Sequence, residues 1–382
     1  MRRPRVRSRP AEEGSHGGER RAAGIRDAAP VSRDEADLLF TGLEQARGIV
    51  LAVSGGPDSA CLMHLVAAWR GTGRRPPVTV ATVDHGLRAG SAREARRVGA
   101  WAKAAGLPHR VLTWSGEKPT SRIQETAREM RYRLLGELAQ KLGASHVVTG
   151  HTLDDQAETV LMRLMHGTGI GGLGGMWPEI QRDGVTVARP LLGLRKARLV
   201  ATCEAAGWPF LSDPSNADPR FARARLRGEV LPVLQREGLT PERLAALAAR
   251  ARRAEEALEA RIGAVMAAAA RSGDGRLELD AVLLRGEPDA ILLGVVARAI
   301  VGAAGGLKRP MRLERFEARV LGDLRRALET GTGLRINVGG ALLDLRRDGR
   351  LLVRPEPPRR TRQGGTPAAP AGAAARRGAD KV

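Results

Sequence analysis

The feature that most limits how this chain can fold is an alternation of strand-like and helix-like runs between about residues 34 and 212. Short apolar runs rich in β-branched residues are separated by longer runs with a helical spacing of apolar side chains. The predicted strands are Gly48–Val53, Val78–Val83, Arg110–Thr113, His146–Thr149 and Val185–Arg189, and the predicted helices are Ala60–Trp69, Ala92–Ala105, Ser121–Leu142, Leu153–Met165 and Lys196–Ala206. This order predicts an α/β fold with a doubly wound, mostly parallel sheet, in which ligands bind beyond the C-terminal ends of the strands.

The remaining sequence predicts a second, mostly helical domain and two basic tails. An Ala-, Arg- and Leu-rich helical pattern follows the α/β region, and short alternating runs then surround Asp348-Gly349, a dipeptide that favours tight turns. Both ends of the chain lack a hydrophobic period, as disordered segments do. The expected divisions are disordered basic tails at 1–33 and 355–382, an α/β domain at 34–230, a helical domain at 231–332 and a short β segment at 333–354.

The formal net charge of +21 predicts a polyanionic partner such as RNA. The two tails contribute +5 and +4, which leaves +12 for the middle of the chain. The alternative is compositional drift, because Ala, Gly and Arg dominate and Arg greatly outnumbers Lys. No apolar stretch approaches membrane-spanning length, the Arg-rich N-terminus lacks an apolar signal core, and Cys61 and Cys203 are far apart. We therefore expect a cytoplasmic protein with no membrane partner, and nothing in the sequence indicates an oligomeric state.

The segment Ser54-Gly55-Gly56-Pro57-Asp58-Ser59 lies between the first predicted strand and the first predicted helix. Glycines allow the backbone to approach a phosphate, serine hydroxyls donate to it, and the start of a helix offers free N–H groups. Asp58 beside phosphates is expected to help hold Mg²⁺. An ordinary turn is the alternative, and a Walker-type loop is excluded because Gly-Lys never occurs. The whole segment resembles the pyrophosphate-binding loop of the N-type ATP pyrophosphatases, which cleave ATP to AMP and pyrophosphate while adenylating a carbonyl oxygen.

Polar residues follow two further predicted strands. Asp84 and His85 begin the segment Asp84–Arg88 and are expected to contact nucleotide or metal, although a plain polar loop is equally compatible with them. Gly150 and His151 follow the fourth strand and are expected at the same nucleotide site. Because the ends of parallel strands meet at one edge of the sheet, these residues should lie near Ser54.

The helix after His151 carries two acids on one face. Thr152 can cap this helix, and acids in the first turn would then have a purely structural explanation. However, Asp155 and Glu158 are three residues apart and share a face that can point into the crevice. Carboxylates there suit Mg²⁺ binding, for which Asp58 and Asp155 are the expected ligands, or the deprotonation and positioning of an amine nucleophile.

Arginines recur near these motifs. Arg128 and Arg131 share one face of a predicted helix, where they could neutralise a leaving pyrophosphate or bind RNA phosphate, or simply form a solvated face. Residues expected to bind RNA phosphate are Arg195, Arg223, Arg225 and Arg227. The run Gly169–Gly174 matches G-x-G-x-x-G but follows a helix, so we interpret His166–Met176 (the glycine loop) as a flexible loop near the active site and not as a dinucleotide fingerprint.

Taken in order, these motifs resemble the tRNA(Ile)-lysidine synthetases over roughly residues 45–230. The matching segments are Ser54–Ser59, Asp84–Arg88, Arg128–Tyr132, Gly150–Thr159, His166–Met176, Arg189-Pro190-Leu191 and Asp213–Arg227. The resemblance implies that ATP activates the C2 oxygen of the wobble cytidine in a minor isoleucine tRNA with a CAU anticodon, and that the amino group of free lysine then displaces AMP to give lysidine. One departure is Ala224, where the family often has Asn.

The same resemblance implies roles for individual residues. Ser54–Ser59 would hold the ATP phosphates, Asp155 and Glu158 would position Mg²⁺ or lysine, and Arg128 and Arg131 would act near the reacting nucleotide. Alternatives are a tRNA 2-thiolation enzyme on the same fold, which normally needs a Cys pair that is lacking as C-x-x-C here, and a metabolite synthetase, which leaves the basic charge unexplained. A catalytically inactive RNA-binding module is disfavoured by the intact acids.

Overall fold

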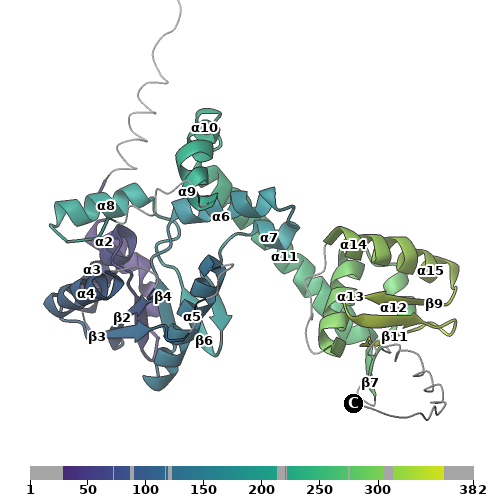
Figure 1. Cartoon of the computed structure of the whole chain (residues 1–382). Coiled ribbons are helices and arrows are strands. Elements are labelled where there is room, and N and C mark those ends of the chain that lie inside the picture. Colours follow the sequence, from purple (N-terminus) through teal and green to yellow (C-terminus); the bar gives the residue numbers. More distant parts are fainter. Residues whose placement is uncertain are drawn as a thin grey trace, which may run out of the picture. The chain divides into compact units, whose positions relative to one another are not determined.

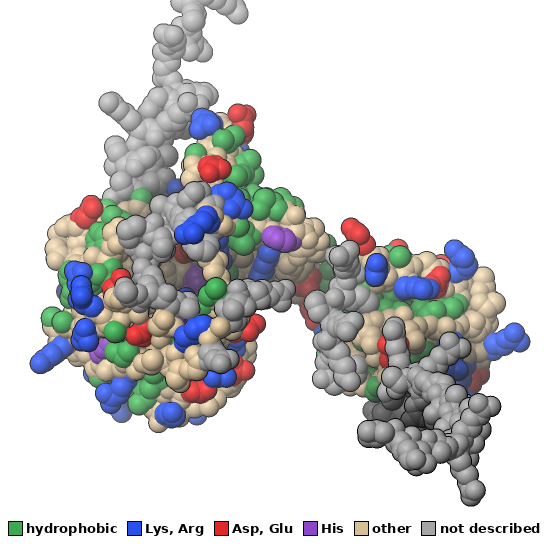
Figure 2. Space-filling view, in the orientation of Figure 1, with side chains coloured by type: hydrophobic (Ala, Val, Ile, Leu, Met, Phe, Trp, Pro, Cys, Tyr) green, Lys and Arg blue, Asp and Glu red, His purple; other side chains and the backbone are tan. Residues whose placement is uncertain are grey.

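The computed structural model describes residues 29–71, 73–86, 90–116, 118, 123–212, 220, 222–273, 276–304 and 313–356. The chain forms two compact units, Met1–Glu255 and Glu256–Val382, and the division falls within the long helix α11 (Pro241–Ala269). The boundary between the α/β domain and the helical domain that the sequence places after residue 230 remains a prediction. On the face shown in Figure 2, basic side chains lie on both units with acidic side chains among them.

Unit 1 is built on a six-stranded sheet with the strand order β3-β2-β1-β4-β6-β5. The strands are β1 (Ile49–Ala52), β2 (Val78–Asp84), β3 (His109–Thr113), β4 (His146–Thr149), β5 (Glu179–Arg182) and β6 (Val185–Ala188). All neighbours pair in parallel except β5 and β6, which are antiparallel. The chain adds β2 and β3 on one side of β1 and then returns to place β4 on the other side. The order of strand addition therefore reverses between β1 and β4. Crevices in doubly wound folds form at that point.

Helices cover both faces of this sheet (Figure 1). The helices are α2 (Arg33–Leu39), η1 (Thr41–Leu43), α3 (Pro57–Arg70), α4 (Ser91–Ala104), α5 (Ile123–Lys141), α6 (Leu153–Met165) and α8 (Lys196–Ala205). Ile49 and Leu51 of β1 pack into a core with α2, α3, α4 and α8, whereas Val50 packs with α5 on the opposite face. Strands buried on both faces are expected to be nearly all apolar, which explains the Ile-Val-Leu-Ala sequence of β1.

A smaller helical layer follows the sheet within unit 1. Its elements are α7 (Ile170–Leu173), α9 (Ala222–Arg225), the π-helical turn η3 (Leu226–Val230), α10 (Leu231–Arg236) and the first part of α11. Ala157 and Val160 of α6 form a small core with Leu231 of α10 and Leu244 of α11. This core joins the helix that carries Asp155 and Glu158 to the segment that carries Arg227.

Unit 2 contains a five-stranded antiparallel sheet in the order β7-β8-β11-β10-β9. Its strands are β7 (Ala270–Gly273), β8 (Arg276–Asp280), β9 (Leu334–Val338), β10 (Ala341–Leu345) and β11 (Arg350–Pro355), and its helices are α12 (Ala281–Arg285), α13 (Asp289–Ala304), α14 (Leu313–Glu317), the π-helical turn η4 (Ala318–Leu324) and α15 (Arg325–Thr330). The turn expected at Asp348-Gly349 joins β10 to β11, and Gly349 has a positive φ of 81°. The strands β7 and β8 lie in the range that the sequence predicts to be helical. The strands were missed because strong helix formers before them obscure the short alternation of Leu277 and Leu279.

The predicted fold class is confirmed: a mostly parallel α/β sheet is accompanied by a helical region and a small antiparallel sheet. The strand β5 was not predicted, since Glu-Ile-Gln-Arg has a single strongly apolar residue. Among the described residues, no helix combines the length and the apolar character needed to cross a bilayer.

Candidate active site

The segment Ser54–Ser59 forms a tight turn between β1 and α3. Gly55 has a φ of 92°, and a side chain added there would lie 2.7 Å from Leu211, so both conformation and space require glycine. The Ser59 hydroxyl fills the turn, because it accepts from the backbone N–H groups of Ser54 and Gly55 at 3.2 Å each. Helix α3 begins after Gly56, which has no side chain to cap it, and the free N–H groups of its first turn suit an anion.

Gly150 brings the end of β4 against this turn. A Cβ atom at Gly150 would lie 3.1 Å from the carbonyl oxygen of Asp58, closer than the backbone can readily accommodate. The next residue, His151, bonds through Nδ1 to the Thr149 hydroxyl at 2.8 Å. Burial lowers the pKa of His151 to about 4, so this ring is neutral at pH 7. The strand ends predicted to meet, at Ser54 and Gly150, therefore do meet.

Asp58 projects from the first turn of α3 and forms an ion pair that sequence reasoning missed. Its Oδ2 accepts from Lys196 Nζ at 2.9 Å, while its Oδ1 is buried and has no hydrogen-bond partner among the described residues. Burial raises the pKa of Asp58, and the charge of Lys196 opposes that rise. The unpaired oxygen is an available ligand for a cation or a proton donor.

The start of α8 is held by acids from two other helices. The backbone N–H of Lys196 donates to Asp154 Oδ2 at 2.7 Å. Arg195 lies 3.5 Å from Asp154 Oδ1 and 3.2 Å from Glu242 Oε1. Arg195, expected to bind RNA, is thus engaged by two acids, and this arrangement favours a role in positioning α8.

Asp155 helps to cap the start of α6, which is the structural alternative to a catalytic role for this residue. Its Oδ2 accepts from the Thr152 backbone N–H at 2.8 Å and from the Thr152 hydroxyl at 2.9 Å, which forms a capping box at the start of α6. The negative charge of Asp155 also contributes to raising the pKa of both Asp58 and Glu158, after the larger effect of burial. The three carboxylates therefore share one electrostatic environment.

Glu158 is fully buried and paired with Arg227. The Glu158 Oε1 atom accepts a hydrogen bond from Arg227 Nε at 2.7 Å and lies 2.7 Å from Arg227 Nη2 in an ion pair, whereas Oε2 has no partner among the described residues. The Glu158 side chain has 0% exposure, whereas that of Arg227 has 40%. Burial raises the pKa of Glu158 despite this pair. Arg227, expected to contact RNA, is here the counter-ion of the most buried acid in the site.

The acids offer oxygens of the kind that Mg²⁺ prefers. Mg²⁺ commonly takes one or two carboxylates together with substrate phosphates. The unpartnered Oδ1 of Asp58 and Oε2 of Glu158 fit this requirement better than Asp155, whose Oδ2 is already used in the capping box. Across the described part of the chain, no three His, Cys, Asp or Glu side chains come close enough to hold a metal by themselves.

Asp84 and His85 lie at the end of β2, as predicted. Asp84 Oδ1 accepts from the Gly86 backbone N–H at 2.9 Å, and hydrogen bonds from Ser91 and Gly86 lower the pKa of Asp84. His85 Nε2 lies 3.4 Å from Arg131 Nη2. Burial lowers the pKa of His85 to about 4, with a further contribution from Arg131. Leu87, Arg88 and residues 213–219 lie outside the described residues, as does Phe221.

The glycine loop differs from the flexible segment expected from its composition. It contains the short helix α7, and three side chains bind its backbone. Arg163 donates to the Gly172 and Gly175 carbonyls at 2.8 Å each, and Arg252 donates to the Gly174 carbonyl at 2.7 Å. Gln156 binds both the N–H and the carbonyl of Met176, at 2.7 and 3.0 Å. Hydrogen bonds from α6 and α11 therefore hold the loop against the helix that carries Asp155 and Glu158.

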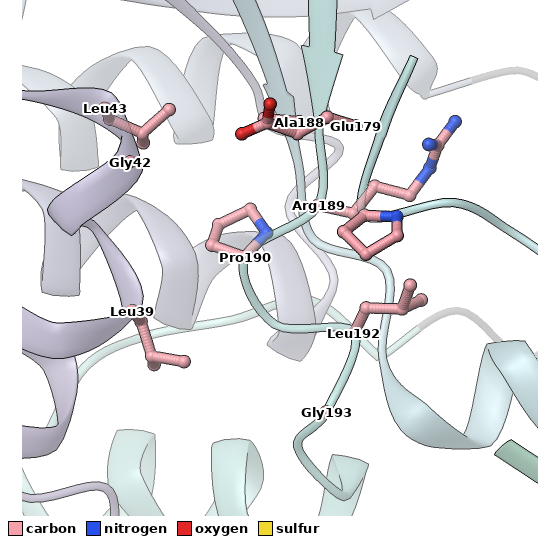
Figure 3. A pocket seen from close by; sticks show the side chains of 10 residues that line it. Leu39, Gly42, Leu43, Glu179, Ala188, Arg189, Pro190, Leu192 and Gly193 are labelled. Atoms are coloured by element: carbon pink, nitrogen blue, oxygen red, sulfur yellow. The ribbon is translucent and has the colours of Figure 1, made fainter. Parts of the chain in front are cut away.

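A cavity of about 320 Å³ lies apart from these residues, between α2, η1 and the segment after β6 (Figure 3). Leu39, Leu43, Pro190 and Leu192 make most of its wall apolar. In Figure 3 the Arg189 side chain extends away from Leu39 and Leu43, and its Nη1 donates to the Trp177 carbonyl at 2.6 Å. The cavity contains none of the predicted site residues.

The two cysteines are buried and adjacent although they are far apart in sequence. Cys61 in α3 and Cys203 in α8 are both 0% exposed. A hydrogen bond with Cys203 and burial raise the pKa of the Cys61 thiol. A sulfur carrier needs an accessible thiolate, so this arrangement disfavours the tRNA 2-thiolation alternative.

Comparison with known proteins decides the family. Residues 30–234 match the family model described as the PP-loop domain. The chain is 58% identical over 318 residues to the tRNA(Ile)-lysidine synthase of Methylobacterium sp. (strain 4-46), an alignment that covers 83% of this chain and 91% of that protein. This chain belongs to the tRNA(Ile)-lysidine synthase family.

Further relatives agree with this assignment. The tRNA(Ile)-lysidine synthase of Methylobacterium nodulans is 53% identical over 341 residues, covering 87% of this chain and 98% of that protein. That of Bradyrhizobium sp. (strain BTAi1) is 46% identical over 352 residues, with coverage of 88% and 98%. Among solved structures, the U34-tRNA thiolase NcsA from Methanococcus maripaludis, with its [4Fe-4S] cluster, has a TM-score of 0.50 at 14% identity and covers 58% of this chain and 79% of its own. At this identity the likeness concerns the fold alone.

Proposed function

We propose that this member of the lysidine synthase family ligates free lysine to C2 of the wobble cytidine in the CAU-anticodon isoleucine tRNA. The cytidine C2 oxygen attacks the α-phosphorus of ATP and pyrophosphate leaves. The lysine amino group then attacks C2, loses a proton and expels AMP. The observation that carries the proposal is the 58% identity to a lysidine synthase over 91% of that protein's length. We place the reaction in the cytoplasm, where tRNA, ATP and free lysine occur together.

The Ser54–Ser59 turn is assigned to the ATP phosphates. The positive φ of Gly55, the uncapped start of α3 and the close approach of Gly150 support this assignment. Asp84, His85 and His151 complete the nucleotide site at neighbouring strand ends. Mg²⁺ would be held by Asp58 through Oδ1, and the negative charge of Asp155 acts on the same site. The bound Mg²⁺ would offset the negative charge of the phosphates.

Glu158 and Asp155 are assigned to the lysine amine. A fully buried carboxylate with one unpartnered oxygen is suited to accept a hydrogen bond from an ammonium group and then its proton. Burial raises the pKa of Glu158, which brings its proton affinity closer to that of a working general base. Arg227 fixes the other oxygen of this carboxylate and so sets its orientation.

Contacts to tRNA are assigned to exposed arginines near the crevice. Arg223 and Arg225 of α9 are exposed and suited to RNA phosphates, while Arg128 and Arg131 of α5 would act near the reacting nucleotide. Arg227 and Arg195 retain their proposed place at the RNA site, but their acid partners give them an additional positioning role.

The deciding experiment is mass spectrometry of nucleosides from an unmodified CAU-anticodon isoleucine tRNA incubated with protein, ATP, Mg²⁺ and lysine. The expected product is a cytidine that has gained a lysyl group and lost water, formed only when both ATP and lysine are present. Reactions that lack either compound serve as controls. Formation of AMP without any lysine adduct would retain adenylation and reject ligation of lysine.

A further inference from the structure

A segment that precedes the large sheet, residues 29–35 (the strap), is bound to the helix α8. The strap ends in the first turn of α2, and α2 and α8 lie side by side (Figure 1). The backbone N–H of Val31 donates to the Thr202 hydroxyl at 2.8 Å, and both residues are buried. This hydrogen bond joins positions that are 171 residues apart, so it fixes the strap to α8 by tertiary structure and not by chain connectivity.

Arg198 of α8 makes most of the connection to the strap. Its Nη1 and Nη2 donate to Oε1 and Oε2 of Glu35, at 2.6 and 2.7 Å, in a bidentate pair. Its Nε donates to the Ala29 carbonyl at 2.9 Å, and Nη2 also donates to the Pro30 carbonyl at 3.3 Å. The hydrogen bonds from Arg198 hold the pKa of Glu35 below its ordinary value, so this acid is ionised at neutral pH. The planar guanidinium fits this set of acceptors, whereas a lysine ammonium does not.

The same helix reaches the Ser54–Ser59 turn with other side chains. Lys196 donates through Nζ to Asp58 Oδ2 at 2.9 Å, and the Cys203 thiol lies 3.9 Å from the Pro57 carbonyl oxygen. Because an α-helix turns by about 100° per residue, positions 196 and 203 share one face, and positions 198 and 202 share a second face about 130° away. The helix α8 is therefore held by the turn on one face and by the strap on another.

The geometry of the Arg198–Glu35 pair suits orientation better than stability. The Arg198 side chain is 19% exposed and that of Glu35 is 33% exposed, and pairs that water reaches contribute little to the free energy of unfolding. A bidentate fork nevertheless fixes both the distance and the angle between the two elements that it joins. The Lys196 side chain is flexible and 35% exposed, so where its ammonium group lies depends on where the backbone of α8 is held.

We propose that Arg198 and Glu35 are positioning residues for the ATP site, which hold α8 against the strap so that Lys196 stands beside Asp58 before ATP binds. The inference rests on the proposed assignment of the ATP phosphates to the Ser54–Ser59 turn. It adds to that site two residues that lie on the other side of α8 and act through Lys196. The strap thereby becomes part of the machinery that prepares the turn for the nucleotide.

Double-mutant cycles on ATP affinity test the proposal in the full-length protein. Equilibrium binding of ATP is measured with Mg²⁺ and without tRNA or lysine. Arg198→Ala removes the fork, Glu35→Gln removes the charge of its partner but keeps the side-chain shape, and each is also combined with Lys196→Met. Two exposed positions supply the controls: Glu204→Gln changes one charge in α8, and Arg33→Ala removes an arginine from α2.

The expected effect is selective for ATP. Arg198→Ala should weaken ATP binding about tenfold and Glu35→Gln about threefold, which lies in the range of couplings within one hydrogen-bonded network. In the Lys196→Met protein, which itself binds ATP more weakly, either substitution should add less than about twofold, because the lysine through which the strap acts is gone. Arg198→Lys keeps the charge but not the fork, so its affinity should lie between those of wild type and Arg198→Ala. In steady-state ligation the KM for ATP should rise and the KM for lysine should not.

Three results would overturn the positioning role. They are losses that add in full to that of Lys196→Met, an unchanged ATP affinity with a lowered Tm, and an equal rise of KM for all substrates. If Arg198→Ala does not fold, the milder Glu35→Gln carries the same cycle from the opposite side of the pair. A wild-type protein that shows the coupling in ATP binding but forms no lysine adduct would refute the proposed function and leave the role of the strap standing.

Discussion

Removing Arg227 should destabilise unit 1 in a way that depends on pH. In the variant Arg227→Ala, the fully buried Glu158 loses the guanidinium that binds its Oε1 through a hydrogen bond from Nε and an ion pair with Nη2. Breaking a buried ion pair by removing one partner commonly costs about 3–5 kcal/mol. Because the Arg227 side chain is 40% exposed, solvent screens the pair, and we expect a loss of about 2 kcal/mol at pH 8.

The sign of the pH dependence follows from the direction of the Glu158 pKa shift. Burial already raises this pKa above its ordinary value of 4.5, and removal of Arg227 would raise it further. The folded variant then binds the proton more tightly than the unfolded chain does, so its free energy of unfolding is highest at low pH. It falls as pH rises from 4.5 toward the raised pKa, by at most about 1.4 kcal/mol per pH unit. The penalty of the substitution should therefore be smaller at pH 5 than at pH 8.

Tryptophan fluorescence during urea unfolding measures this effect selectively. All five tryptophans, the last of which is Trp208, belong to unit 1, so the signal reports on that unit alone. A loss of about 2 kcal/mol corresponds to about 4–8 °C in Tm for a unit of this size. Arg236→Ala, which removes an exposed arginine in α10, is the control. Equal losses at pH 5 and pH 8 would refute the reasoning, because they would show that Arg227 acts through packing and not through the charge of Glu158.

Three further substitutions test other parts of the site. Asp155→Asn keeps an acceptor for the helix cap, so it should cost about 1 kcal/mol or less in stability but abolish lysine ligation while sparing tRNA binding; full turnover would reject the catalytic assignment. Arg252→Ala removes a donor to the glycine loop and should lower the free energy of unfolding by about 1–2 kcal/mol. Amide hydrogen exchange in residues 171–177 should become faster. Unchanged protection would show that the other side chains suffice to hold the loop. Lys196→Met leaves Asp58 without its counter-ion and should raise the Asp58 pKa, moving the onset of Mg²⁺-dependent ATP binding to higher pH; an unaltered pH profile would exclude Asp58 as the group that must ionise.

Local sequence patterns were enough to predict the parallel sheet and the places where its strand ends meet. The predicted strands correspond to β1, β2, β3, β4 and β6, since each is a short apolar run between helical periods. The glycine turn at Ser54–Ser59 and the cap at Thr152 were likewise predictable, because each depends on neighbouring residues only. The strand β5 was missed, because its pairing with β6 supplies the order that its own polar sequence does not indicate.

Partners across the fold were beyond local reasoning. No pattern near Lys196 indicates that its ammonium group pairs with an aspartate 138 residues earlier in the chain. The glycine loop was expected to be flexible from its composition, but the side chains that hold it come from α6 and from α11, which begins far downstream. Arg227 was grouped with exposed phosphate-binding arginines because its sequence neighbours are basic, whereas its pair with Glu158 depends on how η3 lies against α6.

The ion pair between Lys196 of α8 and Asp58 of the Ser54–Ser59 turn also has a consequence for the synthesis of the chain. A growing chain that ended just after β6 would contain every strand of the large sheet and the complete turn, yet Asp58 would still lack its cation. It would also lack α8, whose Lys196 backbone N–H donates a hydrogen bond to Asp154. The ion pair of Asp58 therefore forms only after α8 has left the ribosome, and in a split version of this enzyme divided between β6 and α8, Asp58 should gain its cation only when the halves associate.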